Sequence, residues 1–291
     1  MSTLIFGGSN SQDLAKRIAR RTKSRYFPLI ATHFPDGELY IKFSTSVAGK
    51  KVVIVNSLYP SPDEEMMEVI FAVKTAKELG AKKVTVIAPY LAYMRQDKRF
   101  HPGEAKSNTI MSKLLSCADE LITIDPHLHR IHSLKEIFKI KTKALTANRV
   151  LASYINKNVS NPIVVGPDEE SGQWANEIAR LAEAEHFVLK KKRYTAEKVR
   201  IIVKTNLDLK GRNVVIVDDI ISTGHTMIEP IKQLKRMGVK KVYCIGVHGL
   251  FVLNALQKLK QLGAKVVSTN TIQSKVSKID VSELIAEALR V

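Results

Sequence analysis

Short apolar runs alternate along this chain with longer stretches in which apolar residues recur every three or four positions. The runs 52–55 (VVIV), 84–89 (VTVIAP) and 121–125 (LITID) are rich in apolar and β-branched residues, which is typical of strands buried on both faces of a parallel sheet. Between the first two, residues 65–80 have helical spacing and end in glycine, so we predict a helix there. This alternation predicts a doubly wound α/β sheet.

The second half of the chain repeats the first. Segments such as GKKVVIVNSL and GRNVVIVDDI recur in the same order at a separation of about 160 residues. The matching segments pair Gly49 with Gly211, Lys77 with Lys235, Ala15 with Ala175 and Phe27 with Phe187. We therefore expect two tandem doubly wound parallel-sheet domains, related by internal duplication, over residues 1–145 and 146–291.

The clearest candidate chemistry follows the strand predicted at 214–217. Ligands of open α/β sheets bind beyond the carboxyl ends of the strands, and Asp218 and Asp219 stand at that end. A turn rich in hydroxyls and glycine follows them, made of Ser222, Thr223, Gly224, His225 and Thr226. These groups and the N-terminus of a helix predicted over 226–238 suit a phosphate monoester, whereas carboxylates suit sugar hydroxyls or a metal. The sequence thus predicts a ribose-phosphate site, with an ordinary turn capped by threonine as the alternative.

The corresponding place in the first copy has a different composition. It reads Asn56-Ser57 and continues as LYPSPDEE. The acid pair is missing and negative charge has been added, so we expect no ribose-phosphate site in the first copy.

Segment 217–226 (VDDIISTGHT) resembles the 5-phosphoribosyl-1-diphosphate motif shared by phosphoribosyltransferases and ribose-phosphate diphosphokinases. Other segments resemble the diphosphokinases alone, in that family's order, including FPDGELYIKF at 34–43 and PYLAYMRQDKRF at 89–100. The chain is similar over essentially its whole length to the ribose-phosphate diphosphokinase, or phosphoribosyl pyrophosphate synthetase, family. It resembles a divergent branch of archaeal type.

The resemblance implies a role for each matching residue. It implies ATP contacts for Phe34, Asp36, Gly37, Glu38, Arg95, Gln96 and Asp97. It implies magnesium ligands at His127 and Asp168, and a catalytic pair at Lys191 and Arg193. It implies binding of ribose 5-phosphate by Arg193, Asp218, Asp219 and the turn from Ser222 to Thr226.

The chain departs from the family pattern at three of its motifs. GPDEESG around Asp168 replaces the usual Ser-Pro-Asp-x-Gly-Gly, and Lys98 stands where the family has arginine. Ser222 stands where many members have aspartate, and His225 where glycine is common. These departures fit a branch distant from the best-known bacterial and animal enzymes, so we carry over no regulation from them.

Taken alone, several of these segments also fit simpler structures. Residues 34–43 fit a hairpin turn around Asp-Gly, and 89–100 and 190–193 fit solvated basic segments. The histidines of 127–132 (HLHRIH) raise the possibility of zinc, although no cysteine or carboxylate completes such a site nearby.

The family's reaction uses Mg²⁺ and transfers the diphosphoryl group of ATP to the anomeric hydroxyl of ribose 5-phosphate, releasing AMP and feeding nucleotide biosynthesis. Such transfer depends on positioning and charge neutralisation. No GxxxxGK[ST] motif is present, so ATP must be bound by another device. Three rivals remain: a phosphoribosyltransferase, which needs no ATP; a non-enzymatic regulator that kept the fold; and a basic nucleic-acid binder, whose binding would depend steeply on salt.

The net charge of +18 in 291 residues raises the question of polyanionic partners. The lysines are spread along the chain and no aromatic residues interleave a basic stripe. We therefore expect phosphorylated substrates and no nucleic acid, with a lysine-rich surface as the simplest alternative. The family resemblance implies self-association, at least to a dimer, because a neighbouring subunit completes the ATP site in relatives.

Cysteine use and hydropathy bear on the compartment. Cys117 and Cys244 lie in apolar segments without metal-ligand spacing, which is typical of buried reduced thiols. No apolar run approaches the roughly 18 residues of a membrane span, and the first residues do not resemble a secretion signal. We expect a cytoplasmic protein without a membrane partner.

Overall fold

The computed structural model describes residues 2–290 except 169–170, 194–198 and 204, and describes only the backbone of 191–193 and 199–202. Its contacts divide the chain into two compact units. Unit 1 comprises Met1–Thr146, Thr271–Gln273 and Val281–Val291, and unit 2 comprises Ala147–Asn270 and Ser274–Asp280. No helix among the described residues is long and apolar enough to cross a membrane.

Unit 1 contains a seven-stranded sheet in the order β3-β2-β1-β4-β5-β6-β7. All neighbours in it are parallel except β2 and β3, which form an antiparallel hairpin at one edge. The strands are β1 (Thr3–Gly7), β2 (Arg25–His33), β3 (Leu39–Phe43), β4 (Lys51–Val55), β5 (Lys83–Ala88), β6 (Glu120–Ile124) and β7 (Lys141–Leu145).

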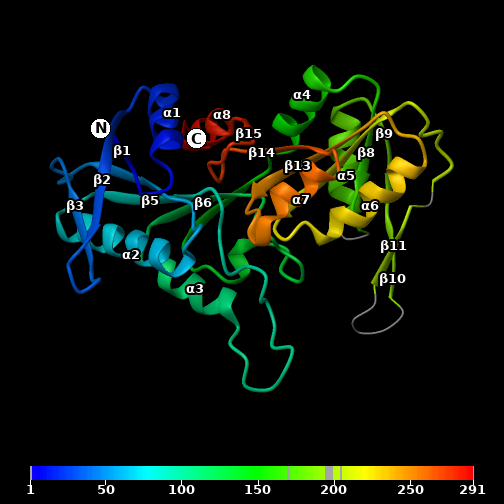
Figure 1. Cartoon of the computed structure of the whole chain (residues 1–291). Helices are drawn as coiled ribbons and strands as arrows, with labels where there is room; N and C mark the ends of the chain where they lie inside the picture. The colour runs from blue at the N-terminus through cyan, green and yellow to red at the C-terminus, as the bar shows by residue number, and fades with distance from the viewer. Residues whose placement is uncertain (1, 169–170, 194–198, 204, 291) are drawn as a thin grey trace. The chain divides into compact units, whose positions relative to one another are not determined.

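Helices cover both faces of this sheet (Figure 1), with α1 and α8 on one face and α2 and α3 on the other. They are α1 (Gln12–Thr22), α2 (Pro62–Glu78), α3 (Ser107–Leu115), the 3₁₀ turn η1 (Leu134–Glu136) and α8 (Ser282–Arg290). Helix α2 begins with proline and three acids, which suit a helix N-terminus. It begins at residue 62, three residues before the predicted start, and ends at residue 78, two residues before the predicted end.

Unit 2 contains a six-stranded parallel sheet in the order β15-β14-β13-β12-β8-β9. Its strands are β8 (Pro162–Gly166), β9 (Glu185–Val188), β12 (Asn213–Ile221), β13 (Lys241–Gly249), β14 (Lys265–Thr269) and β15 (Ser277–Ile279). A separate antiparallel hairpin joins β10 (Lys190–Arg193) and β11 (Val199–Ile202). The helices are α4 (Asn148–Asn158), α5 (Gly172–Leu181), α6 (His225–Arg236), the 3₁₀ turn η2 (Val252–Asn254) and α7 (Ala255–Gln261).

The two units share one strand order. Unit 1 runs β2-β1-β4-β5-β6 where unit 2 runs β9-β8-β12-β13-β14, so each first strand has its second on one side and its third on the other. The expected pair of tandem doubly wound domains is thereby confirmed. The shared order gives each place in unit 2 a counterpart in unit 1.

The end of the chain differs from the expected domain assignment. The chain first passes from unit 1 to unit 2 at Thr146/Ala147, next to the expected boundary, but α8 belongs to unit 1. Its buried Ser282, Ile285 and Ala286 line the inner side of a helix that packs against α1. The repeat assigns the tail to the second copy, so it gave no sign that α8 packs in unit 1.

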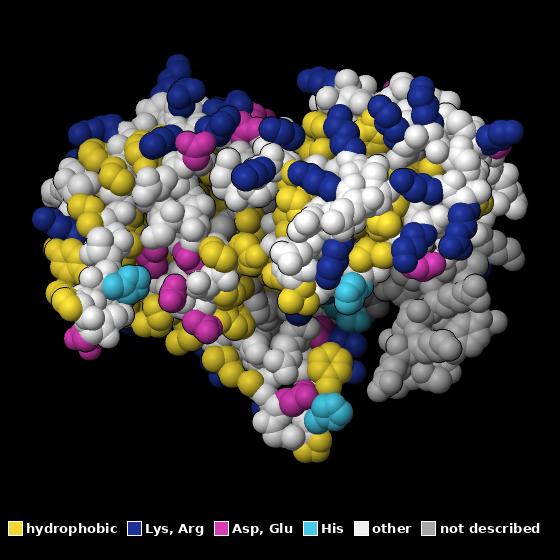
Figure 2. Space-filling model, viewed as in Figure 1, with side chains coloured by type: hydrophobic (Ala, Val, Ile, Leu, Met, Phe, Trp, Pro, Cys, Tyr) yellow, Lys and Arg dark blue, Asp and Glu magenta, His cyan; other side chains and the backbone are white. Residues whose placement is uncertain are grey.

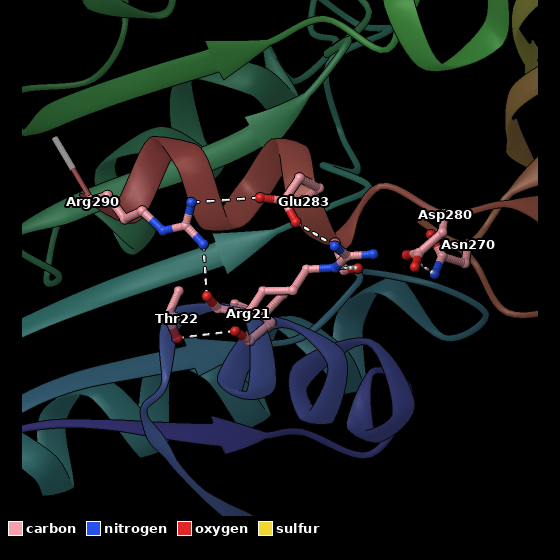
Figure 3. A network of polar contacts seen from close by, with 8 residues as sticks. Arg21, Thr22, Asn270, Asp280, Glu283 and Arg290 are labelled. Atoms are coloured by element: carbon pink, nitrogen blue, oxygen red, sulfur yellow. Dashed lines mark hydrogen bonds and ion pairs between the residues drawn. The ribbon is translucent and has the colours of Figure 1, made fainter. Parts of the chain in front are cut away.

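Polar contacts fasten α8 to α1 (Figure 3). Arg21 donates from Nε to Ser282 Oγ (2.7 Å) and pairs with Glu283, while Arg290 donates to the carbonyl of Arg21 (2.6 Å). Within unit 2, Asn270 donates to Asp280 at 2.9 Å. Since Asn270 and Asp280 each precede a segment that belongs to unit 1, this bond joins the two points at which the chain leaves unit 2.

Candidate functional site

The acid pair and the hydroxyl-rich turn occupy the carboxyl end of β12 in unit 2. The strand extends through Ile221, four residues beyond the predicted end, so Asp218 and Asp219 lie within it and Asp218 stands opposite Gly246 of β13. The turn residues Ser222 and Thr223 are half-buried. Gly224 then has φ +72° at the N-cap of α6, a left-handed conformation that glycine adopts without strain.

The first turn of α6 contains no acidic residue, unlike the first turn of α2. No carboxylate of this turn would therefore repel an anion. The carbonyl of Gly224 accepts from the amides of Met227 (3.0 Å) and Ile228 (3.1 Å), and His225 N–H points at Thr223 Oγ1 (3.5 Å). The N-terminus of a helix favours negative charge through its free N–H groups and its dipole. Together with the hydroxyls of Ser222, Thr223 and Thr226, it offers hydrogen-bond donors suited to a phosphate group, and we call this arrangement the phosphate cradle.

Three carboxylates converge beside this cradle. Burial and the nearby carboxylates of Asp219 and Asp168 raise the pKa of Asp218 well above its usual range. Asp168 lies after β8, the neighbour of β12, where its carboxylate accepts from the amide of Ser171 at 2.9 Å. Glu169 and Glu170, which set GPDEESG apart from the family pattern, lie outside the described residues. Accumulated negative charge of this kind is relieved by sugar hydroxyls or by a divalent cation.

The nearby thiol is inert. Cys244 is fully buried on β13, and burial together with Asp218 raises its pKa to about 12. The expectation of a buried thiol holds for Cys244, whereas Cys117 is only half-buried.

In unit 1, Phe34, Asp36, Gly37 and Glu38 form the exposed tip of the β2–β3 hairpin. The amide of Phe34 donates to the carbonyl of Glu38 (2.8 Å), and Asp36 Oδ1 accepts from the amide of Glu38 (3.2 Å). Gly37 has φ +94°. The Phe34 ring is 50% exposed and stands edge-on to Tyr40, with 5.6 Å between centroids. The hairpin turn around Asp-Gly is therefore present, and its residues are exposed.

Arg95, Gln96 and Asp97 lie on the loop that follows β5. Arg95 is exposed, while Gln96 Oε1 accepts from the Ser107 hydroxyl at 2.9 Å. Asp97 is buried and binds Arg130 at 2.8 Å. Burial alone would raise the pKa of Asp97, but the amide and guanidinium of Arg130 hold it below its usual value. The structure thus turns Asp97 inward, a pairing that its motif did not reveal.

His127 lies on the loop after β6, next to the loop of Arg95. Strands β5 and β6 are parallel neighbours, with Ala88 opposite Thr123, so both loops leave the same edge of the sheet. His127 is half-buried, and His129 and His132 are exposed. Within the described part of the chain, no three histidine, cysteine or acidic side chains are arranged to hold a metal by themselves, which gives the zinc alternative no support.

Lys191 and Arg193 are placed only by their backbone, on β10. Their side chains, and residues 194–198 beyond them, lie outside the described residues. The expectation that this pair acts in catalysis remains a prediction.

The place in unit 1 that corresponds to the phosphate cradle is filled by its own side chains. Glu65 and Glu68 of α2 are buried there. Both carboxylate oxygens of Glu68 accept from Ser9, at 3.0 Å from the amide and 2.6 Å from the hydroxyl, and Glu65 accepts from Asn56 at 2.7 Å. Burial, with help from Glu68, raises the pKa of Glu65 to about 7. The sequence shows that this segment gains acids, but it does not show that Glu65 is buried.

Comparisons with known proteins cover both units. Residues 3–118 match the N-terminal domain of ribose phosphate pyrophosphokinase, and residues 133–285 match the phosphoribosyl transferase domain. The chain is 36% identical to the ribose-phosphate pyrophosphokinase of Methanobrevibacter smithii, over 99% of this chain and 100% of that protein. It is also 36% identical to the enzyme of that name from Sulfolobus acidocaldarius, over 98% and 100%.

A solved structure agrees with these sequence matches. The crystal structure of phosphoribosylpyrophosphate synthetase from Mycobacterium smegmatis superposes with a TM-score of 0.86 at 26% identity, covering 100% of this chain and 98% of that one. Relatives that match from end to end, together with the strand order and the loop on β12, show that the chain belongs to the ribose-phosphate pyrophosphokinase family.

Proposed function

We propose that this chain is a magnesium-dependent ribose-phosphate diphosphokinase that converts ATP and ribose 5-phosphate into AMP and 5-phosphoribosyl 1-diphosphate. Within the family already shown, the observation that carries the assignment is the cradle at the end of β12. It combines two carboxylates with a hydroxyl-rich turn and an acid-free helix N-terminus, which are the groups that a phosphorylated sugar requires.

Ribose 5-phosphate binds with its phosphate in the turn from Ser222 to Thr226. The hydroxyls and the first amides of α6 donate hydrogen bonds to the phosphate oxygens, and the Gly224 backbone permits the close approach. Asp218 and Asp219 accept hydrogen bonds from the ribose hydroxyls. The anomeric hydroxyl attacks the β-phosphorus of ATP in line, and AMP leaves.

ATP binds to the hairpin tip and to the loop of Arg95 in unit 1. Phe34, with half of its ring exposed, stacks against the base, and the hairpin residues Asp36, Gly37 and Glu38 contact the nucleotide. Arg95 and Gln96 donate to the polyphosphate, a contact that charge assistance strengthens. The Asp97 carboxylate is already occupied by Arg130, so we give it no direct contact with ATP.

Magnesium fits the charge of these sites. Burial, followed by the carboxylates of Asp219 and Asp168, raises the pKa of Asp218, and a divalent cation would offset the negative charge of these neighbouring acids. Mg²⁺ usually takes one or two protein ligands and completes its shell with phosphate oxygens and water, which suits residues that form no closed metal cage. His127 in unit 1 and Asp168 in unit 2 are each proposed as a magnesium ligand, and bound magnesium would neutralise charge on the diphosphate. Lys191 and Arg193 are proposed to stabilise the charge that develops during transfer.

Self-association is the proposed partner interaction. Unit 1 exposes apolar side chains at positions 67 and 71 of α2 and 110 and 114 of α3, each pair on one helical face. The residues are Met67, Phe71, Ile110 and Leu114, between 40% and 52% exposed. Hydrophobic side chains also gather over unit 1 on the face drawn in Figure 2. Exposed apolar surface of this kind is typical of an interface, and we assign it to a second copy of the chain.

A single assay tests the proposed reaction. The protein is incubated with ATP, ribose 5-phosphate and Mg²⁺, and AMP is separated by chromatography. We expect AMP and 5-phosphoribosyl 1-diphosphate from the wild type and neither above background from Lys191→Ala. A protein that instead joins a nucleobase to 5-phosphoribosyl 1-diphosphate without ATP would be a phosphoribosyltransferase, and the proposal would be wrong.

A further inference from the structure

We propose that Arg130 is a positioning residue, which binds Asp97 and thereby holds the loop of Arg95 and Gln96 against the loop of His127. The consequence for ATP rests on the proposed function, but the clamp itself rests on geometry alone. All of its residues lie in unit 1.

Each oxygen of the Asp97 carboxylate accepts a hydrogen bond from Arg130. Oδ1 lies 2.8 Å from Nη1 of the guanidinium, and Oδ2 lies 3.1 Å from the backbone nitrogen. The carboxylate thus fixes both the side chain and the main chain of a residue that stands three positions after His127. An ion pair between two exposed chains is mobile and contributes little, but here the Asp97 side chain is only 2% exposed.

The clamp joins two loops that have no regular secondary structure of their own. The first runs from β5 to α3 and carries Arg95 and Gln96, and the second runs from β6 to η1 and carries His127. Neighbouring strands set where both loops start, but nothing in the sheet sets where their tips lie. Asp97 comes directly after Gln96, so its anchorage fixes the backbone of the residues proposed to donate to the polyphosphate.

Phe100 adds a second contact to the same guanidinium. The Cζ atom of Arg130 lies 5.9 Å from the Phe100 ring centroid, and Lys98 Nζ lies 5.0 Å from it. The attraction between these two cations and the ring favours the loop conformation that brings Phe100 close to Arg130. Residues 97–100 therefore contact Arg130 through both a carboxylate and a ring.

Removing the guanidinium has a defined consequence. In Arg130→Met, the side chain at position 130 keeps about the same volume, but the buried Asp97 carboxylate loses its charged partner. The loop that carries Asp97 then moves so that the carboxylate reaches water. Arg95 and Gln96 then lose their fixed position. Misplacement of a binding group by about 1 Å can cost as much as about a hundredfold in rate, so we expect the KM for ATP to rise about tenfold. The KM for ribose 5-phosphate stays unchanged.

Hydrogen–deuterium exchange tests the clamp without any substrate. Amides of residues 91–104 should exchange faster in Arg130→Met than in wild type. The matched control is Arg17→Met, which removes an exposed arginine whose ion pair with Asp13 lies on α1, and it should leave that segment unchanged. Unchanged exchange of 91–104 in folded Arg130→Met would overturn the inference. Should that variant not fold, Asp97→Asn, which keeps the shape of the side chain, replaces it with the same expectation.

Kinetics then connect the clamp to the reaction. Asp97→Asn and Arg130→Met should raise the KM for ATP by similar factors, and the double variant no further, because both remove one interaction. Arg130→Lys should restore part of the loss. Equal rises in both KM values, or effects that multiply, would contradict a positioning role. Absence of AMP from the wild type would count against the proposed function, while faster exchange in Arg130→Met would still support the clamp.

Discussion

Asp218 and Asp219 show how one pair of neighbouring residues acquires two environments. Both stand on β12, but Asp219 accepts from the amide of the next residue, Ile220, at 2.7 Å. Burial and the surrounding acids raise the pKa of Asp218. The amide of Ile220 holds the Asp219 carboxylate in place, so Asp219 is the residue through which we test the binding of ribose hydroxyls.

We expect Asp219→Asn to raise the KM for ribose 5-phosphate by about 10- to 100-fold, the equivalent of one lost charge-assisted hydrogen bond. The KM for ATP should change far less. Asn can still accept from the Ile220 amide, so the fold should persist. The control is Asp208→Asn, since exposed Asp208 also accepts a backbone amide, at 3.0 Å from Lys210. Equal effects on both substrates would argue against the assignment of the acid pair.

Glu65 gives a second prediction at this scale. Its folded-state pKa of about 7 lies above the ordinary 4.5, so the folded protein binds the proton more tightly than the unfolded chain. The resulting stability is complete below about pH 4.5 and is lost as the pH rises through about 7. Glu65→Gln mimics the protonated acid, and we expect it to be more stable than wild type at pH 8 by about 3 kcal/mol and equal to it near pH 4.

Chemical denaturation at both pH values measures this difference. Glu78→Gln is the matched control, because Glu78 is exposed on the same helix and is not among the groups that shift the pKa of Glu65, so it should change both values far less. The same dependence of stability on pH in wild type and Glu65→Gln would show that Glu65 does not carry the buried proton.

At the scale of elements, α2 and α6 explain why only one copy has a cradle. Both helices end within the matched segments that begin at Lys77 and Lys235, but α2 has 17 residues and α6 has 12. The extra length of α2 lies at its N-terminus, where its acids include the buried Glu65. In unit 2 the same stretch is the hydroxyl-rich turn. One added helical turn thus replaces an anion cradle by carboxylates of the chain itself.

Two glycines at opposite ends of α6 allow an effect on substrate binding to be distinguished from an effect on stability. Gly224 has φ +72° at the N-terminus and Gly238 has φ +77° after the C-terminus. Alanine costs roughly 1–2 kcal/mol in this conformation, so both Gly224→Ala and Gly238→Ala should lower the free energy of unfolding by similar amounts. Only Gly224→Ala should also raise the KM for ribose 5-phosphate. A similar rise in Gly238→Ala would mean that strain anywhere in α6 is sufficient.

For the whole molecule, the apolar surface of α2 and α3 predicts the oligomeric state. Phe71→Glu places a charge in the proposed interface, and we expect it to shift the protein toward monomer in light scattering after size-exclusion chromatography. Met237→Glu is the control, because Met237 of unit 2 is exposed to the same degree, 41% against 40%. An unchanged mass in Phe71→Glu would place the interface elsewhere.

Most of the fold could be predicted because it follows from local pattern. Buried strands are apolar on both faces and helices have a period of 3.6 residues, so the runs at 52–55 and 214–217 were recognisable as β4 and β12. The repeat predicted that both halves have one fold, and the structure then showed their common strand order. Strand β12 was expected to end at Val217 because acids rarely continue a buried strand, whereas pairing with β13 carries it on to Ile221.

By itself, the sequence determined that two copies of a doubly wound fold follow one another, and that the cradle stands at the end of β12. The first follows from segments that recur along the chain, and the second from residues that are adjacent in it. Only the tertiary structure decided that α8 packs on α1, that Asp97 binds Arg130 and that Glu65 and Glu68 turn inward. These contacts join residues that are far apart in sequence, and their energies come from burial and pairing that no local pattern records.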